Sequence, residues 1–298
     1  KASLIILITM ESQENQYRWP KAEAVYPDRP GRSYALKRLR YRLRAFLHRG
    51  LIAQFEQFIN QHPFLVKLLN EHADYSYPLV HRFLDKRFNG KQRFQAICEN
   101  LLFLPEKLTA LSAPIYKTPL SFGEVIPDFE MILSMTTHQP MEGYWVLELW
   151  HKPRNELVYL LTFAKLGEAL LISVVQGPNF EGSKEMVKQL TKTCHGLRPA
   201  YLMVEMMKAL TKALGFKTLL GIPQKYQNKS RFIQSSHYVV DYDAIFAESG
   251  GQLKDYWELP LEIDRNLDEV PSKKRSMYRK RYAMLDDLAK VIEEKLEL

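Results

Sequence analysis

Apolar residues in the first third of the chain recur every three or four positions, which is the period of an amphipathic helix. The clearest case begins at Ser33, where Leu and Phe side chains share one face and arginines occupy the others. This pattern predicts a basic amphipathic helix over 33–49 that ends near Gly50. Its apolar positions are Leu36, Leu39, Leu43, Phe46 and Leu47.

Further helical patterns follow, over 51–60, over 62–71 and within 76–113. We therefore expect a helical N-terminal subdomain over residues 34–113. The chain before it, residues 1–33, is polar and rich in proline from residue 10 onward, and is predicted to be a loosely ordered arm. The apolar run Leu4–Ile8 is too short to cross a membrane, and Met10 is the expected native start.

From about residue 115 the hydrophobic period shortens toward two and continuous apolar runs appear, as in β-strands. Three strands joined by short turns predict an antiparallel meander, which continues into helices and a further buried strand. Residues 114–298 are thus expected to form one α+β domain, a mostly antiparallel sheet flanked by helices. Its predicted strands are 144–150, 156–164, 169–176, 216–222, 238–240 and 257–259, and its predicted helices are 183–194, 199–214 and 272–297.

Composition changes this picture through charge. The 298 residues are 46% hydrophobic and 26% charged, a balance typical of a folded globular protein, and the net charge is +8. Eight basic residues and no acidic one lie between Arg29 and Arg49, and six more with no acidic one lie between Lys273 and Arg281. The remaining 28 basic residues are outnumbered by 34 acidic ones. The chain is therefore an acidic body with two basic patches.

Several classes of function are disfavoured by what the sequence lacks. Its two cysteines cannot form a disulfide framework or a four-cysteine zinc site, and its eight histidines show no metal-ligand spacing, so no metal site is predicted. Glycine motifs of dinucleotide-binding, P-loop and hydrolase folds do not occur. No window is apolar enough to span a membrane. We expect a cytoplasmic protein, with peripheral attachment to the inner membrane as an alternative.

The segment HGLRP, residues 195–199, is the most informative local motif. A glycine turn places Arg198 at the start of a helix opened by Pro199, and the amides of a helix start suit a phosphate. Gly196 and Leu197 would supply backbone donors, and Arg198 a bidentate one. The alternative is that Gly196 and Pro199 only shape a loop while Arg198 pairs with a carboxylate.

Three other segments carry candidate chemistry beside structural alternatives. Gln176 and Gly177 end the third meander strand, either as one wall of a site or as a plain strand exit. Cys194 and His195 are a thiol and a base, though sequence neighbours rarely face each other. Asp241 is a candidate base opposite His237, while Asp243 is expected to cap a short helix.

The basic segment SKKRSMYRKRY, residues 272–282, alternates cations with tyrosines on one helical face. Such a face suits RNA, anionic lipid or a phosphorylated ligand, or else it is a solvated surface. The helix at 33–49 raises the same question, because its apolar stripe either lies at an interface or joins the core. The candidate binding residues of the C-terminal block are Lys273, Lys274, Arg275, Tyr278 and Arg279.

These motifs together resemble the VirK/YbjX family of Gram-negative bacteria. The resemblance rests on HGLRP, on LLGI at 219–222, on VDYDAIFAESGG at 240–251 and on PSKKRSMYRKRYAMLDDL at 271–288, and it extends over residues 34–296. It implies a role at the cell envelope, in virulence and in resistance to antimicrobial peptides. It does not imply a particular reaction.

The order of elements is also similar to that of GNAT-type acyltransferases, in which a helix start holds the pyrophosphate of an acyl carrier and the sheet splays to admit the acyl arm. The helix expected at 183–194 departs from the usual short glycine-rich loop. By this resemblance the chain is an acyl or aminoacyl transferase that uses acyl-CoA or another phosphate-bearing donor. His195, His237 or Asp241 would then act as acid or base. The alternatives are an RNA- or anionic-lipid-binding accessory protein without enzymatic activity, and a partner-binding protein.

Overall fold

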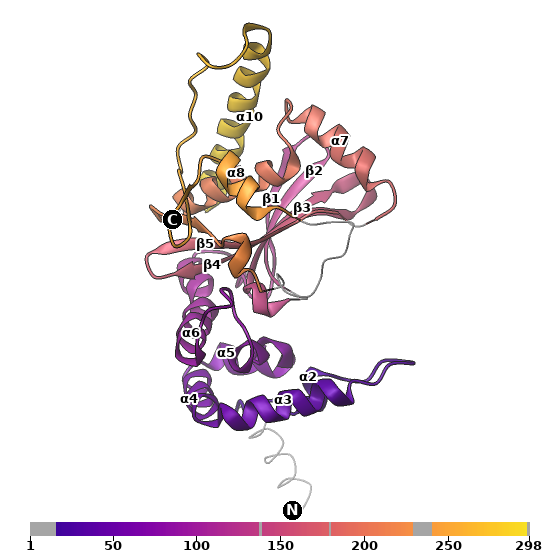
Figure 1. Cartoon of the computed structure of the whole chain (residues 1–298), viewed down its shortest axis with the longest axis vertical. Helices are drawn as coiled ribbons and strands as arrows, with labels where there is room; N and C mark the ends of the chain where they lie inside the picture. Colours follow the sequence, from indigo (N-terminus) through magenta and orange to yellow (C-terminus); the bar gives the residue numbers. More distant parts are fainter. Residues whose placement is uncertain (1–15, 137–138, 179, 229–239, 297–298) are drawn as a thin grey trace, which may run out of the picture. The chain divides into compact units, whose positions relative to one another are not determined.

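The computed structural model describes residues 16–136, 139–178, 180–228 and 240–296 (Figure 1). The chain divides into two compact units, residues 1–102 and 103–298, so the division falls inside helix α6 and before the boundary expected after residue 113. The N-terminal unit is helical and the C-terminal unit is built on a sheet, which confirms the predicted α+β class.

The helical unit follows the predicted pattern closely. Its buried side chains come from one face of each helix, with Phe55, Ile59, Leu65 and Ile97 fully inaccessible to solvent. The elements are α2 (Ala22–Val25), α3 (Ala35–Leu47), α4 (Arg49–Asn60), α5 (Pro63–Glu71), two 3₁₀ turns (Ala73–Tyr75 and Tyr77–Val80) and α6 (Gly90–Lys107).

The described part of the predicted arm is packed against these helices. Tyr17 is 1% exposed, its hydroxyl donates to Ser76 Oγ at 2.6 Å and its backbone N–H donates to Asn60 Oδ1 at 2.8 Å. Trp19 stacks on Tyr41 with ring centroids 6.1 Å apart. The expectation of a loose arm is therefore wrong for residues 17–26, because aromatic burial outweighs the proline-rich, polar composition.

The C-terminal unit contains a sheet of eight strands in the order β1-β2-β3-β4-β5-β6-β8-β7. Every neighbouring pair is antiparallel except β5 and β6, which are parallel and joined through two helices. The strands are β1 (Leu120–Ile126), β2 (Phe129–Met135), β3 (Trp145–His151), β4 (Glu156–Leu166), β5 (Ala169–Gln176), β6 (Leu219–Gly221), β7 (Gln252–Leu253) and β8 (Trp257–Leu259). The helices are α7 (Ser183–Thr193), α8 (Pro199–Ala213), α9 (Tyr242–Glu248) and α10 (Ser272–Leu296), with 3₁₀ turns at Pro140–Glu142, Lys152–Arg154 and Gln224–Tyr226.

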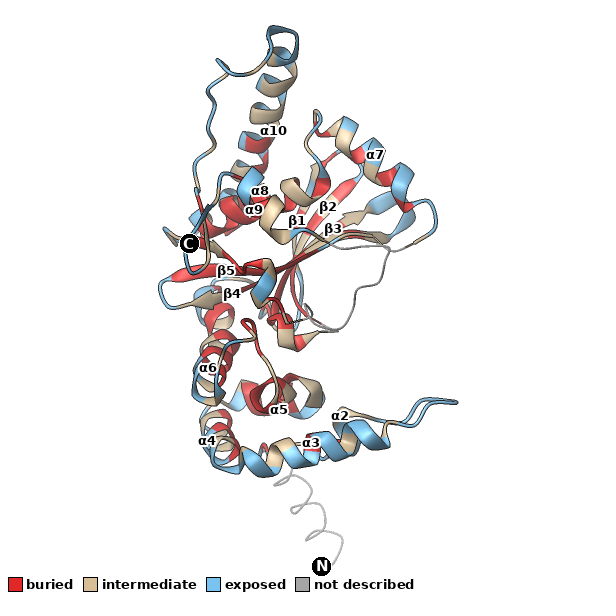
Figure 2. Ribbon diagram, in the orientation of Figure 1, coloured by how far each residue is buried: buried red, intermediate tan, exposed pale blue. Residues whose placement is uncertain are grey.

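The middle of this sheet is the part that the sequence predicts best. In β5 every residue from Ala169 to Val175 is buried, as expected for a continuous apolar run, and Figure 2 shows this strand in red. Helix α8 packs on β4 and β5, and α10 packs on α8. Because β5 and β6 are parallel, the connecting α8 starts near the carboxyl end of β5.

Strands β1 and β2 and the hairpin at the edge of the sheet differ from the prediction. The pairing of β1 with β2 is interrupted by two register shifts, which break the alternation of β1 on which sequence reasoning depends. The closing hairpin was expected to pair 238–240 with 257–259, but β8 pairs with β7. Residues 238 and 239 lie outside the described residues, and Val240 belongs to no strand. The hairpin forms after Gly250, whose φ of +87° suits glycine.

The contact between β6 and α9 depends on one glycine. A Cβ added to Gly221 would lie 2.7 Å from the ring of Phe246, which is itself fully buried. We expect Gly221→Ala to lower the free energy of unfolding by about 1–3 kcal/mol through overpacking. Gly50→Ala is the control, since a Cβ there meets nothing within 4 Å and alanine favours α4 by up to about 1 kcal/mol. Denaturant unfolding followed by circular dichroism measures both, and equal stability of the two variants would contradict this packing.

Candidate functional site

The HGLRP segment forms the turn between α7 and α8. His195 and Gly196 have positive φ values of 54° and 80°, and Arg198 precedes α8 in an extended conformation. The Gly196 amide donates to Thr191 O at 2.9 Å and the Leu197 amide to Cys194 O at 3.1 Å. These two amides were predicted as phosphate donors, but they are used to close the turn. Two successive left-handed residues wrap the chain back onto α7, so these amides face the end of that helix instead of a ligand.

A cation from the C-terminal helix holds this turn. Arg281 donates to His195 O from both Nε, at 3.2 Å, and Nη2, at 2.8 Å. Glycine suits this position because its φ is +80° and because a Cβ there would lie 3.1 Å from Arg281 Nη2. Arg281 was counted in the basic block but was not among the predicted site residues. Only the folded chain brings it to a carbonyl 86 positions away.

Arg198 forms an ion pair, as the structural alternative held. Its Nη2 donates to Glu248 Oε2 and to the Tyr201 hydroxyl, both at 2.8 Å, and its guanidinium lies 4.5 Å from the Tyr201 ring centroid. The side chain remains 61% exposed. Exposed pairs of this kind contribute about 0–1 kcal/mol. An incoming anion could therefore take the place of Glu248 at low cost.

The end of β5 lies near the same arginine. A Cβ on Gly177 would lie 3.1 Å from the Tyr159 hydroxyl, so the strand exit and this phenol are close neighbours. Burial raises the pKa of Tyr159, and the positive charge of Arg198 opposes that rise. Gln176, the last residue of β5, is exposed. Gly177 thus lies against Tyr159, whose pKa burial raises and the charge of Arg198 lowers, and the sequence analysis had not considered this tyrosine.

Helix α9 also contributes residues to this cluster. Asp241 Oδ1 accepts a 2.9 Å hydrogen bond from the Ala244 amide, so Asp241 is the cap that was expected of Asp243. Asp243 instead accepts from Trp257 Nε1 at 2.8 Å. The Tyr242 hydroxyl donates to Val175 O at 3.3 Å, and burial raises its pKa, so this phenol is protonated at neutral pH.

Other predicted residues do not join this cluster as expected. His237 lies outside the described residues. Tyr278 reaches the HGLRP turn through Arg281, whose guanidinium stands 4.2 Å from its ring centroid. Lys273 and Lys274 begin α10, about 12 Å along the helix from Arg281. Arg275 donates to Val270 O at 2.9 Å and so stabilises the start of its own helix. Arg279 lies one turn beyond it on an exposed part of α10.

No helix in the described ranges has the length and apolar character that a membrane span requires. Among the described side chains, no group of three His, Cys, Asp or Glu residues is arranged to hold a metal ion.

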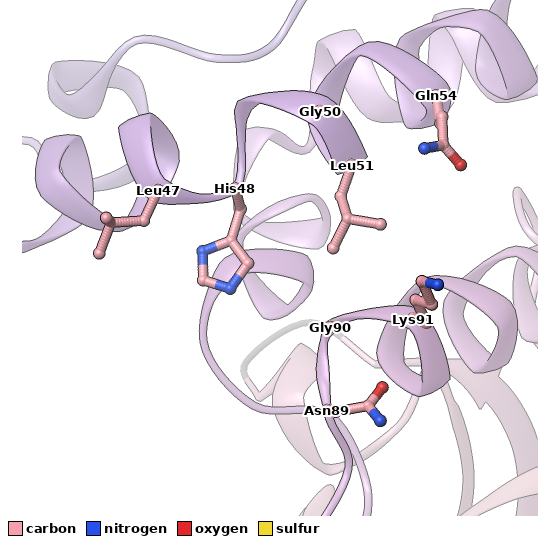
Figure 3. Close-up of a pocket in the computed structure, with 8 residues that line it drawn as sticks. All are labelled: Leu47, His48, Gly50, Leu51, Gln54, Asn89, Gly90 and Lys91. Carbon is pink, nitrogen blue, oxygen red and sulfur yellow. The ribbon is translucent and has the colours of Figure 1, made fainter.

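Two surface hollows are lined by residues outside this cluster. One, of about 480 Å³, is lined by Lys212, Gly215, Phe216, Lys217, Leu261 and Glu262. The other, of about 700 Å³, lies in the helical unit at the end of α3 (Figure 3). Its lining residues are Leu47, His48, Gly50, Leu51, Gln54, Asn89, Gly90 and Lys91.

The architecture defines an α+β protein with a tyrosine-rich cluster at the carboxyl end of its parallel strand pair. Its residues 30–294 match the family described as "Protein of unknown function (DUF535)". The chain belongs to this family, the VirK/YbjX family, which confirms the resemblance found in the sequence.

Curated relatives agree with this membership. An uncharacterized protein of Haemophilus influenzae is 80% identical over 95% of this chain and 97% of its own length. The "Membrane protein LapB" of Mannheimia haemolytica is 65% identical over 73% of this chain and 96% of its own length. The uncharacterized protein YbjX of Escherichia coli is 24% identical over 87% of this chain and 83% of its own length. No solved structure matches the chain.

The buried state of Cys194 bears on the proposed thiol–histidine pair. Burial raises the pKa of the Cys194 thiol to about 12, and that of Cys98 likewise to about 12. At pH 8 only about one thiol in ten thousand is then ionised, and the thiolate is the reactive form. We expect neither cysteine of the native protein to react with a disulfide reagent such as DTNB at pH 8, while both react in guanidinium. Rapid reaction of one thiol per native chain would contradict this expectation and would support a reactive pair of Cys194 and His195.

Proposed function

We propose that this protein transfers an acyl group from a phosphate-bearing carrier to a component of the bacterial envelope. The site is the cluster at the carboxyl end of β5. Membership of the VirK/YbjX family and the name of the relative LapB support an envelope-related role. The reaction itself is proposed from the geometry of the sheet and the groups around it.

The observation that carries the proposal is the short pairing between β5 and β6. Only Leu170–Ile172 pairs with Leu219–Gly221, although β5 continues to Gln176. Its last residues thus run past the end of β6, and the Tyr242 hydroxyl reaches the Val175 carbonyl there. The β5 edge beyond Ile172 thus has no strand partner on the β6 side, and a ligand in extended conformation can pair with such an edge.

The sheet order supports the same function. An antiparallel meander, a parallel pair with helices between, and an edge hairpin follow one another in this chain. This order is the feature that the proposal compares with GNAT-type acyltransferases. In this chain α7 is an additional helix before the turn that would hold the carrier phosphate. Since Gly196 and Leu197 use their amides within the turn, the phosphate would be held by the Arg198 guanidinium and the Ala200 amide in the first turn of α8.

The chemistry needs one base and one acid. The acceptor amine or hydroxyl forms a bond to the acyl carbon and loses its proton to Asp241. The capping bond uses Oδ1 of Asp241, so Oδ2 would accept this proton. The bond between the acyl carbon and the carrier sulfur breaks, and the departing thiolate takes the proton of Tyr242. Regeneration requires only that Asp241 return a proton to Tyr242 through solvent. His195 is the second candidate base from the HGLRP turn.

Ligand binding tests the phosphate contact. We expect acyl-CoA or an acyl carrier protein to raise the melting temperature of the whole chain. Arg198→Gln is expected to weaken binding about 10- to 100-fold, because a charge-assisted hydrogen bond contributes about 1.5–3 kcal/mol. Arg265→Gln is the matched control, since it too is a half-exposed arginine paired with a carboxylate, Asp286. Absence of a shift with acyl-CoA, acyl carrier protein and aminoacyl-tRNA would contradict the proposal, as would equal binding by the two variants.

Turnover tests the acid. Tyr242→Phe is expected to lower the transfer rate about 100-fold while the affinity for the donor stays within twofold, because only the proton donor is lost. Asp243→Asn, in the same helix but directed at Trp257, serves as the comparison. A Tyr242→Phe protein with full transfer activity would exclude this role of the tyrosine.

A further inference from the structure

Helix α3 exposes an unusual amount of apolar surface. Six large apolar side chains among the described residues are strongly exposed, and five of them belong to this one helix. Figure 2 shows α3 largely in pale blue along its length. The five are Leu36, Leu39, Leu43, Phe46 and Leu47, with exposed fractions of 59, 60, 59, 64 and 66%.

These five residues form one continuous stripe. At about 100° per residue they span an arc of about 100° on the helix, the width of a binding face. The opposite side of α3 is already occupied. Tyr41 is 2% exposed, its hydroxyl donates to Pro20 O at 2.7 Å and its ring stacks on Trp19. The inner face therefore holds α3 in the helical unit, and the stripe is not part of the core.

Cations border the stripe on both sides. The helical period places Arg40 beside the stripe on one side and Arg42 on the other, with Arg44 and Lys37 farther round toward the buried face. Arg42 forms an ion pair with Glu23 and Arg38 one with Asp28. Four other cations form no ion pair with an acidic side chain of the described residues. They are Lys37, Arg40, Arg44 and Arg49.

We infer that α3 is an interfacial helix that docks on the surface of an anionic phospholipid bilayer. The stripe enters the boundary between headgroups and acyl chains, and the bordering cations contact lipid phosphates. An apolar arc between two rows of cations is the arrangement that such a surface selects. This inference is independent of acyl transfer, since it uses only residues of the helical unit.

Other occupants fit this surface less well. Single-stranded RNA binds aromatic platforms, whereas four of the five stripe residues are leucines. A second copy of the helix would bring two rows of like charge together, which is repulsive. An anionic lipid surface is complementary to both the apolar stripe and the cations, because it has an apolar layer directly beneath negatively charged headgroups.

The hollow at the end of α3 extends the same surface. Leu47 belongs both to the stripe and to the lining of the hollow, where Leu51 continues the apolar wall and Lys91 adds a cation (Figure 3). Gly90 permits this geometry, because a Cβ there would lie 2.7 Å from Leu51 Cδ1. The apolar surface with its cationic border thus runs from Leu36 to the start of α6.

Vesicle binding by the full chain tests the inference. We expect sedimentation with vesicles of phosphatidylcholine and 30% phosphatidylglycerol to show at least tenfold tighter binding than with phosphatidylcholine alone. The triple variant Leu39→Gln, Leu43→Gln, Phe46→Gln should lose at least tenfold in affinity. Its side chains are exposed, so circular dichroism and the melting temperature should be unchanged. Leu253→Gln, at the sixth exposed apolar residue, should bind like the native chain.

Charge variants separate the two basic patches. Arg40→Gln with Arg44→Gln should reduce binding to the anionic vesicles several-fold, whereas Lys273→Gln with Lys274→Gln removes equal charge from α10 and should not. Equal loss in both pairs would mean that net charge alone attracts the protein, and would overturn the inference.

Insertion depth gives a separate readout. Phe46→Trp should gain fluorescence that brominated phosphatidylglycerol quenches, relative to the native chain under the same conditions. Lack of quenching, or unchanged vesicle binding by the stripe variant, would overturn the inference. The inference would also be overturned if the native chain did not bind vesicles but formed a dimer that the stripe variant could not form. A second copy of the chain would then cover the stripe.

Discussion

Three residues of parallel pairing, Leu170–Ile172 with Leu219–Gly221, join the meander to the rest of the sheet. A parallel pair needs a crossover, and α7 with α8 provides it, so the start of α8 must lie near the carboxyl end of β5. The brevity of the pairing also leaves the last residues of β5 beyond β6, where α9 approaches with Tyr242. The positions of Arg198 and Tyr242 in the candidate site therefore depend on this one junction.

The two basic patches have different physical roles. In α10, Arg281 points into the molecule and holds the HGLRP turn through the His195 carbonyl, which makes part of the C-terminal charge structural. In α3, the inner face is held by Tyr41 while the apolar stripe and several cations stay on the surface. The net charge of +8 thus combines a C-terminal block in which Arg281 is structural, a second block along the exposed side of α3 and an acidic remainder.

Much of the fold could be predicted because periodicity is a local property. The meander strands β3, β4 and β5 and the helices α7, α8 and α10 lie within a few residues of their expected bounds. Strand β1 was missed because two extra residues in its pairing with β2 disrupt its alternation. Strand β2 was missed as well, although its pairing with β3 is regular. The aromatic segment at Tyr17 and Trp19 was taken for a loose arm, because its partners Ser76 and Asn60 are far along the chain. Composition alone does not reveal such partners.

In the candidate site, too, local features could be predicted from the sequence and long-range contacts could not. The sequence by itself determined the helix start at Pro199, the left-handed glycine before it, the two basic blocks and the membership of the family. The tertiary structure decided that Arg198 pairs with Glu248, that Arg281 reaches His195, and that the stripe of α3 faces outward. Helical period shows which residues share a face, but the packing of distant segments decides whether that face meets protein or solvent.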